Sequence, residues 1–237
     1  MKAHTKLTAA LAATGLALAA SSATAATTIL SEDWQTPNVA NKTQLDDTNT
    51  FAGWKFIQGN GNVFKLKDTP DNGIPGGAEG SANQVLQFEW AGSAAEYDTG
   101  HNWSATDSFN VSFNATELNW SNQSDRTVVL SLTETSRDGG GNLIGTTVWT
   151  KEYALPEYDS NHDGAAEDWS LAQTFTDTID ASLWGAGTPG SALTLEVGST
   201  DSRGLYIDNI VLDLVPEPST TALLGLGGLA LILRRRK

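Results

Sequence analysis

The chain has 237 residues, no cysteine, and 28 acidic against 14 basic side chains, which gives a formal net charge of −14. Without cysteine, disulfide bonds, metal–thiolate sites, covalent haem attachment and thiol nucleophiles are excluded. So acidic a chain would be repelled by nucleic acid phosphates and anionic membrane surfaces, which excludes DNA and RNA binding.

The first 25 residues have the composition of a signal peptide. Lys2 and Lys6 give a positive start, residues 7–20 form an apolar run, and residues 23–25 (Ala-Thr-Ala) supply small side chains at the cleavage positions. We expect cleavage after Ala25 rather than a retained membrane helix, because the apolar run is short and the small-residue site follows at once. The rest of the chain would then be exported.

Residues 26–214 form the body, which is long enough for one sizeable core and too short for two large domains. The body holds eight of the basic and twenty-seven of the acidic side chains, so its formal charge is −19. Such a body would attract cations. Calcium is the natural candidate in an exported domain that lacks disulfides.

Alternating apolar and polar residues predict β-strands throughout the body. Residues 108–115 place Phe109, Val111 and Phe113 on one face and polar side chains on the other, and residues 84–90 alternate in the same way. The other predicted strands are residues 54–57, 62–67, 127–135, 146–153, 193–197 and 205–214. No long segment of the body has helical periodicity. We therefore predict an all-β fold, a single antiparallel β-sandwich of jelly-roll type.

The two ends of the body resemble the galactose-binding-like jelly rolls of carbohydrate-binding modules. Residues 29–34 (ILSEDW) are similar to the first strand of that family and residues 205–212 (LYIDNIVL) to the last. In those domains an acid of the first strand and an aspartate of the last share a structural calcium ion, which implies calcium binding by Glu32 and Asp208. The residues alone allow a second interpretation, in which Glu32 caps a turn and Asp208 faces solvent.

A second candidate calcium site lies at residues 159–168. Asp159, Asn161 and Asp163 stand at alternate positions, Gly164 permits a sharp turn, and Glu167 falls at the ninth position of a calcium loop. The twelfth position lacks the bidentate glutamate of an EF-hand, and no helices flank the loop. The segment is therefore either a calcium loop of another type or a solvated acidic turn.

Tryptophan is frequent, with eight residues in the chain. Aromatic rings stack on sugar rings, and Trp103 and Trp120 stand next to asparagine at the loop-like ends of predicted strands, so both are candidate glycan platforms. The alternative for each is packing in the core or at its rim. Trp54 and Trp90 continue apolar patterns, and we expect them to be buried.

The sequence has no recognisable catalytic arrangement. It contains neither a Gly-x-Ser-x-Gly elbow nor a His-Glu-x-x-His helix. Glycoside hydrolysis needs only two carboxylates, and Glu89, Glu134, Glu152 and Glu196 lie on predicted strands. Alternation places most of them on a solvated face, so we predict no catalytic residue.

The tail, residues 215–237, has three parts. It opens with Val215, Pro216, Glu217, Pro218 and Ser219, continues with an uncharged segment, residues 219–233, and closes with Arg234, Arg235, Arg236 and Lys237. As a helix, the uncharged segment would be about 22 Å long, short of the roughly 30 Å hydrocarbon core of a membrane. We therefore predict a short transmembrane helix with its basic end in the cytoplasm.

These three parts, in this order, resemble the PEP-CTERM sorting signal of Gram-negative bacteria. The resemblance implies recognition and processing by an exosortase, a membrane transpeptidase of organisms that make extracellular polysaccharide. The protein would be held transiently in the inner membrane and then released to the cell surface or extracellular matrix. The alternative is an ordinary C-terminal membrane anchor.

The expected function is that of an exported, non-catalytic surface or matrix protein with extracellular polysaccharide and Ca2+ as ligands. Two alternatives remain open from the sequence. One is a polysaccharide-active enzyme, a glycoside hydrolase or lyase, on a similar sandwich, and the other is a purely structural surface protein.

Overall fold

The computed structural model of the chain describes residues 25–34, 43–45, 51, 53–58, 63–67, 84–88, 92–117, 127–155, 173–200 and 205–216. These residues form twelve strands and one short 3-10 helix, η2 (Ala181–Leu183). The strands are β1 (Thr27–Glu32), β2 (Thr43–Leu45), β3 (Trp54–Ile57), β4 (Val63–Lys67), β5 (Gln84–Phe88), β6 (Ala94–Asn102), β7 (Ser108–Glu117), β8 (Thr127–Glu134), β9 (Thr147–Ala154), β10 (Gln173–Ile179), β11 (Ala192–Ser199) and β12 (Leu205–Val215). The predicted signal peptide before residue 25 and the predicted transmembrane helix lie outside the described residues.

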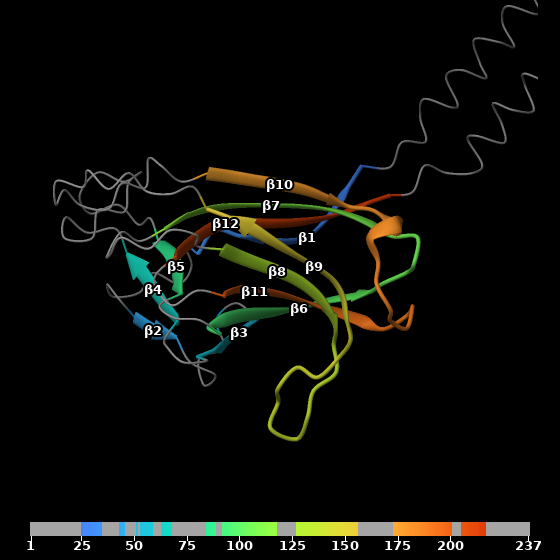
Figure 1. Cartoon of the computed structure of the whole chain (residues 1–237), viewed down its shortest axis with the longest axis horizontal. Coiled ribbons are helices and arrows are strands. Elements are labelled where there is room, and N and C mark those ends of the chain that lie inside the picture. Colours follow the sequence, from blue (N-terminus) through green and yellow to red (C-terminus); the bar gives the residue numbers. More distant parts are fainter. Residues whose placement is uncertain are drawn as a thin grey trace, which may run out of the picture.

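The strands form two antiparallel sheets that face each other (Figure 1). The seven-stranded sheet has the order β10-β7-β12-β5-β4-β2, and β1 pairs with β12 beside this path. The five-stranded sheet has the order β3-β6-β11-β8-β9. The predicted all-β antiparallel sandwich is therefore confirmed.

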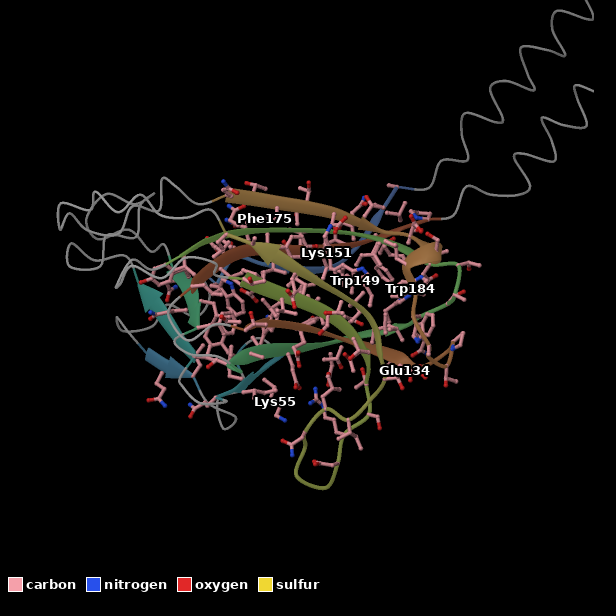
Figure 2. All side chains as sticks on the ribbon, in the orientation of Figure 1. Lys55, Glu134, Trp149, Lys151, Phe175 and Trp184 are labelled. Carbon is pink, nitrogen blue, oxygen red and sulfur yellow. The ribbon has the colours of Figure 1, made fainter. Side chains whose placement is uncertain are left out.

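The core lies between the sheets and follows the predicted alternation. Phe109, Val111 and Phe113 of β7 are buried, and the opposite sheet contributes residues such as Leu195. Phe113 stacks on Phe175 of β10, with ring centroids 5.0 Å apart. Phe175 is labelled in Figure 2. Full burial of one such side chain stabilises the fold by about 1.5–3 kcal/mol, so this interface between the sheets is the main source of stability.

Three strands were not predicted from the sequence: β2, β6 and β10. Strand β6 begins with small alanines and continues with the polar sequence Glu-Tyr-Asp-Thr-Gly-His-Asn, so its apolar alternation is weak. Strand β10 alternates threonine with inward residues, but one of these is Asp177, whose charge masks the pattern. Asp177 is tolerated there because Lys151 of β9 donates a hydrogen bond to it at 2.5 Å across the open edge of the sandwich.

Strand β12 is irregular in its middle. Its pairing with β7 shifts between Asp208 and Val211, and Asn209 has a positive φ of 52°. This bulge separates Asp208 from the regular part of the strand. At the far end of the strand Leu214 pairs with Thr27 of β1, so the two ends of the body leave the sandwich side by side (Figure 1).

Candidate functional site

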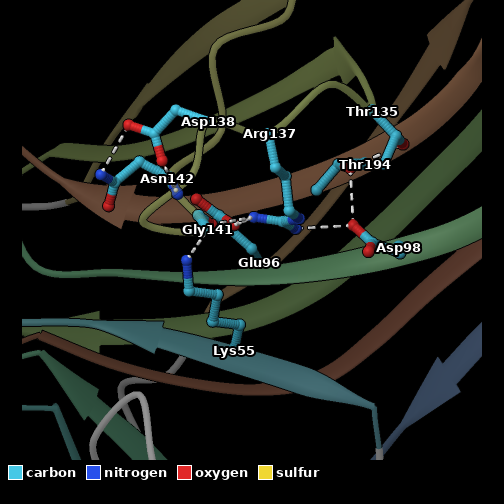
Figure 3. A network of polar contacts seen from close by, with 9 residues as sticks. All are labelled: Lys55, Glu96, Asp98, Thr135, Arg137, Asp138, Gly141, Asn142 and Thr194. Carbon is cyan, nitrogen blue, oxygen red and sulfur yellow. Dashed lines mark hydrogen bonds and ion pairs between the residues drawn. The ribbon is translucent and has the colours of Figure 1, made fainter.

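A polar network covers the outer face of the five-stranded sheet (Figure 3). Its centre is Arg137, in the connection between β8 and β9, whose guanidinium donates to Glu96 at 2.5 Å and to Asp98 at 2.7 Å. Both acids belong to β6 and point to the same face because they are two residues apart. Burial opposes the charge of Arg137, but hydrogen bonds to Glu96 and Asp98 outweigh this and raise the pKa of Arg137.

Further contacts fix the β8–β9 connection on the sheet. The Lys55 ammonium of β3 donates to the carbonyl of Gly141, at the tip of the connection (Figure 3). Thr194 of β11 donates to Asp98 at 2.8 Å and lies 2.8 Å from the hydroxyl of Thr135. The connection is therefore pinned to three neighbouring strands, and it shields the polar face beneath it.

Two carboxylates lie directly opposite each other on this face of the sheet. Glu96 of β6 pairs with Glu196 of β11, and Glu96 is only 1% exposed. One oxygen of Glu96, Oε1, is buried and has no hydrogen-bond partner among the described residues. Burial, and then the charge of Glu96, raise the pKa of Glu196, although Ser131 donates to it at 3.5 Å. Glu196 itself lies on the outer face of the sheet and is partly buried.

The remaining carboxylates predicted to lie on strands have other roles or positions. Glu134 accepts a hydrogen bond from the backbone amide of Thr188, and Glu152 is exposed on β9. Glu89 lies outside the described residues. Sequence reasoning missed Glu96, Asp98 and Arg137, whose only signal was the rarity of basic side chains in the body.

A second group of carboxylates lies where β1 ends beside the bulge of β12. Asp208 is 3% exposed, so the interpretation in which it faces solvent is wrong. Its carboxylate accepts hydrogen bonds from the backbone and side-chain amides of Asn209, at 2.8 and 3.2 Å. Burial raises the pKa of Asp208 to about 7; the Asn209 amide opposes this rise, and the charges of Asp33 and Glu32 add to it. Asp208 is thus a buried acid near two other acids.

Glu32 has the capping role that the second interpretation gave it. Its Oε1 accepts a hydrogen bond from the backbone amide of Trp34 at 2.8 Å, and Trp34 has a positive φ of 56°. Within the described ranges, no three His, Asp or Glu side chains converge into a complete metal-binding group. The other candidate ligands, Asp159, Asn161, Asp163 and Glu167, lie outside those ranges and stay a prediction.

The described tryptophans do not form a surface platform. Trp103 is 2% exposed and packs against Trp184, with ring centroids 5.3 Å apart, which is the core-packing alternative rather than the sugar platform. Trp54 is 1% exposed, as predicted. Trp90 and Trp120 lie outside the described residues.

The tail is described only as far as Val215, the last residue of β12, and Pro216. Glu217, Pro218, Ser219, Arg234, Arg235 and Arg236 lie beyond it. In the part of the chain that the structure describes, no helix is long and apolar enough to cross a membrane.

Known proteins of similar fold include the CBM22-1 xylan-binding domain of Paenibacillus barcinonensis Xyn10C. The two sequences are 16% identical, the match covers 82% of this chain and 98% of that domain, and the TM-score is 0.44. A family 11 carbohydrate-binding module from Clostridium thermocellum, solved with a mixed-linked tetrasaccharide, has 14% identity, coverages of 73% and 96%, and a TM-score of 0.38. The K3 adhesin domain of Lys-gingipain from Porphyromonas gingivalis has 12% identity, coverages of 78% and 98%, and a TM-score of 0.42.

No curated protein sequence matches the chain. Residues 214–237 match the family profile of the PEP-CTERM protein-sorting motif. The chain therefore carries a PEP-CTERM motif, which marks exported proteins of Gram-negative bacteria for sorting to the cell surface.

Proposed function

We propose that this protein is a surface or matrix protein, sorted by an exosortase, whose sandwich binds extracellular polysaccharide without catalysing a reaction. The PEP-CTERM motif at residues 214–237 carries the proposal, because it marks the body as cargo for the cell surface. Before processing, the uncharged segment and the basic cluster would hold the protein in the inner membrane. Exosortase action would then release the body.

The sorting step can be tested in the native host by replacing Pro216-Glu217-Pro218 with alanines. We expect the variant to keep its tail, to migrate as a larger species and to stay with the membrane fraction. Replacement of Thr220 and Thr221, just beyond the motif's box, serves as the control. If the box variant has the size and surface delivery of the wild type, the tail is an ordinary anchor.

Binding of polysaccharide is supported by the polar outer surface of both sheets. Exposed hydroxyl, amide and carboxylate side chains alternate with core residues along β7, β9 and β10, and such groups are the hydrogen-bond partners that sugar hydroxyls need. Co-sedimentation of the mature protein with the host's extracellular polysaccharide tests this. Absence of binding to every polymer fraction would leave the purely structural role.

A glycan-active enzyme is the second candidate, because Glu96 and Glu196 form an opposed pair of carboxylates. Their surroundings favour binding over catalysis, because Arg137 holds Glu96 in an ion pair and Glu96 is only 1% exposed. Release of new reducing or unsaturated sugar ends, abolished by Glu196→Gln, would establish the enzyme instead.

We further propose that Glu32 and Asp208 hold a structural calcium ion. Support comes from the burial of Asp208 together with the neighbouring charges of Asp33 and Glu32, since a bound cation would offset their repulsion. Calcium takes six to eight oxygen ligands, so backbone or other oxygens would complete the site. Equal melting temperatures in calcium and in chelator would reject this site.

A further inference from the structure

The outer face of the seven-stranded sheet has an open hollow of about 560 Å³. It lies over three neighbouring strands, β10, β7 and β12, whose register fixes its lining. Thr178 lies opposite Asn110, and Asn110 opposite Asp213, while Thr176 lies opposite Ser112 in the next row. Alternation sends Phe109 and Val111 into the core and these polar side chains outward.

The polar groups around the hollow are held in place by their neighbours. The Thr178 hydroxyl donates to the Asn110 side-chain oxygen at 2.9 Å, which fixes the amide of Asn110. Asp213 accepts a hydrogen bond from Thr28 of β1 at 2.6 Å. Side chains that are already oriented lose less freedom when a ligand binds, so this surface is suited to hydrogen-bonding a polyhydroxyl chain.

The charge of the hollow favours neutral polysaccharides over acidic ones. Among its described lining residues, Asp213 is the acid whose side chain points outward, and there is no lysine or arginine. Asp177 also borders the hollow, but its side chain turns inward, where it forms an ion pair with Lys151 of β9. The body as a whole has a formal charge of −19. A polymer of uronic acids or sulfated sugars would be repelled, whereas a neutral chain would not.

We propose that this hollow is the polysaccharide site of the protein and that it takes a neutral glycan rather than an acidic one. This inference rests on the proposed function, and it adds the place of binding and the class of polymer. The proposal places the ligand on the seven-stranded sheet, whereas the Arg137 network lies on the five-stranded sheet.

The test uses the mature protein and the host's extracellular polysaccharide, separated by anion exchange into neutral and acidic fractions. We compare the wild type with Asn110→Ala/Thr176→Ala, which removes two exposed hydrogen-bonding groups from the hollow. Thr150→Ala, exposed on β9 in the other sheet, is the matched control. Affinity electrophoresis measures binding, and circular dichroism confirms that each variant is folded.

We expect the neutral fraction to bind the wild type and Thr150→Ala equally, and the double variant about tenfold or more weakly. If the double variant binds the neutral fraction as tightly as the wild type, the hollow is not the site, and the proposed function stands. If only the acidic fraction binds, the polymer class is wrong. If neither fraction binds, the proposed function and this inference both fail.

Discussion

Replacing Asp208 with asparagine separates two opposite effects of this carboxylate. Without calcium, a charged Asp208 destabilises the folded state, because it is 3% exposed and lies near Glu32 and Asp33. With calcium, the same charge is a ligand. The variant should therefore be more stable than the wild type in chelator and less responsive to calcium.

The rise in the pKa of Asp208 gives the size of the first effect. A change from 3.8 to about 7 corresponds to about 4 kcal/mol of unfolding free energy, at about 1.4 kcal/mol per pKa unit. Because the folded pKa lies above the unfolded one, the contribution of Asp208 to stability is full below about pH 4 and is lost as pH rises through about 7. In chelator at pH 8, Asp208→Asn should gain up to about 4 kcal/mol.

Urea unfolding at pH 5 and pH 8, in chelator and in calcium, measures both effects. Calcium at a hundred times its dissociation constant should add about 2.7 kcal/mol to the wild type and little to Asp208→Asn. Glu152→Gln, an exposed acid of β9, is the control and should behave as the wild type. The reasoning is refuted if calcium stabilises the wild type and Asp208→Asn equally, or if wild-type stability in chelator is the same at both pH values.

Three further predictions concern the network and the core. Arg137→Ala should lower the unfolding free energy by about 3–5 kcal/mol in urea, because it leaves Glu96 buried without its cation; a loss under about 1 kcal/mol would contradict this. Glu196→Gln should raise the unfolding free energy at pH 7 and not at pH 4, because burial raises the pKa of Glu196 and the folded state favours its protonated form. Equal gains at both pH values would contradict the idea that the charge of Glu196 destabilises the fold beside Glu96. Trp103→Ala should cost about 3–5 kcal/mol and leave glycan binding by the folded protein unchanged, whereas a specific loss of binding would restore the platform role.

The strands that could be predicted from the sequence have one apolar and one polar face. In β7 the alternation of Phe109, Val111 and Phe113 is complete, because this strand lies inside its sheet and packs on the core along its length. Strand β10 is at the edge of the same sheet, where Asp177 can turn inward and still meet Lys151. A charge at an inward position interrupts the signal on which the prediction depends.

The candidate sites depended on contacts that no local pattern contains. Trp103 was predicted near a loop, but the segment after η2 covers it: a Cβ at Gly187 would lie 2.9 Å from its ring. The pairing of Arg137 with Glu96 joins residues 41 positions apart, through the register of β6 against its neighbours. The proximity of Glu32 to Asp208 could be expected from the sequence, because the family resemblance placed them in the first and last strands as ligands of one calcium ion.

The position of the hollow links binding to sorting. Asp213 is two residues before Val215, where β12 ends, and only residues 216–218 separate the strand from the uncharged segment that follows. Three extended residues span at most about 11 Å. If that segment is inserted in the membrane before processing, as we propose, the end of the sheet that carries Asp213 and Asn110 would lie close to the lipid surface, where a long polymer has little room. Removal of the tail would therefore both release the body and open the hollow to polysaccharide, so that binding follows sorting.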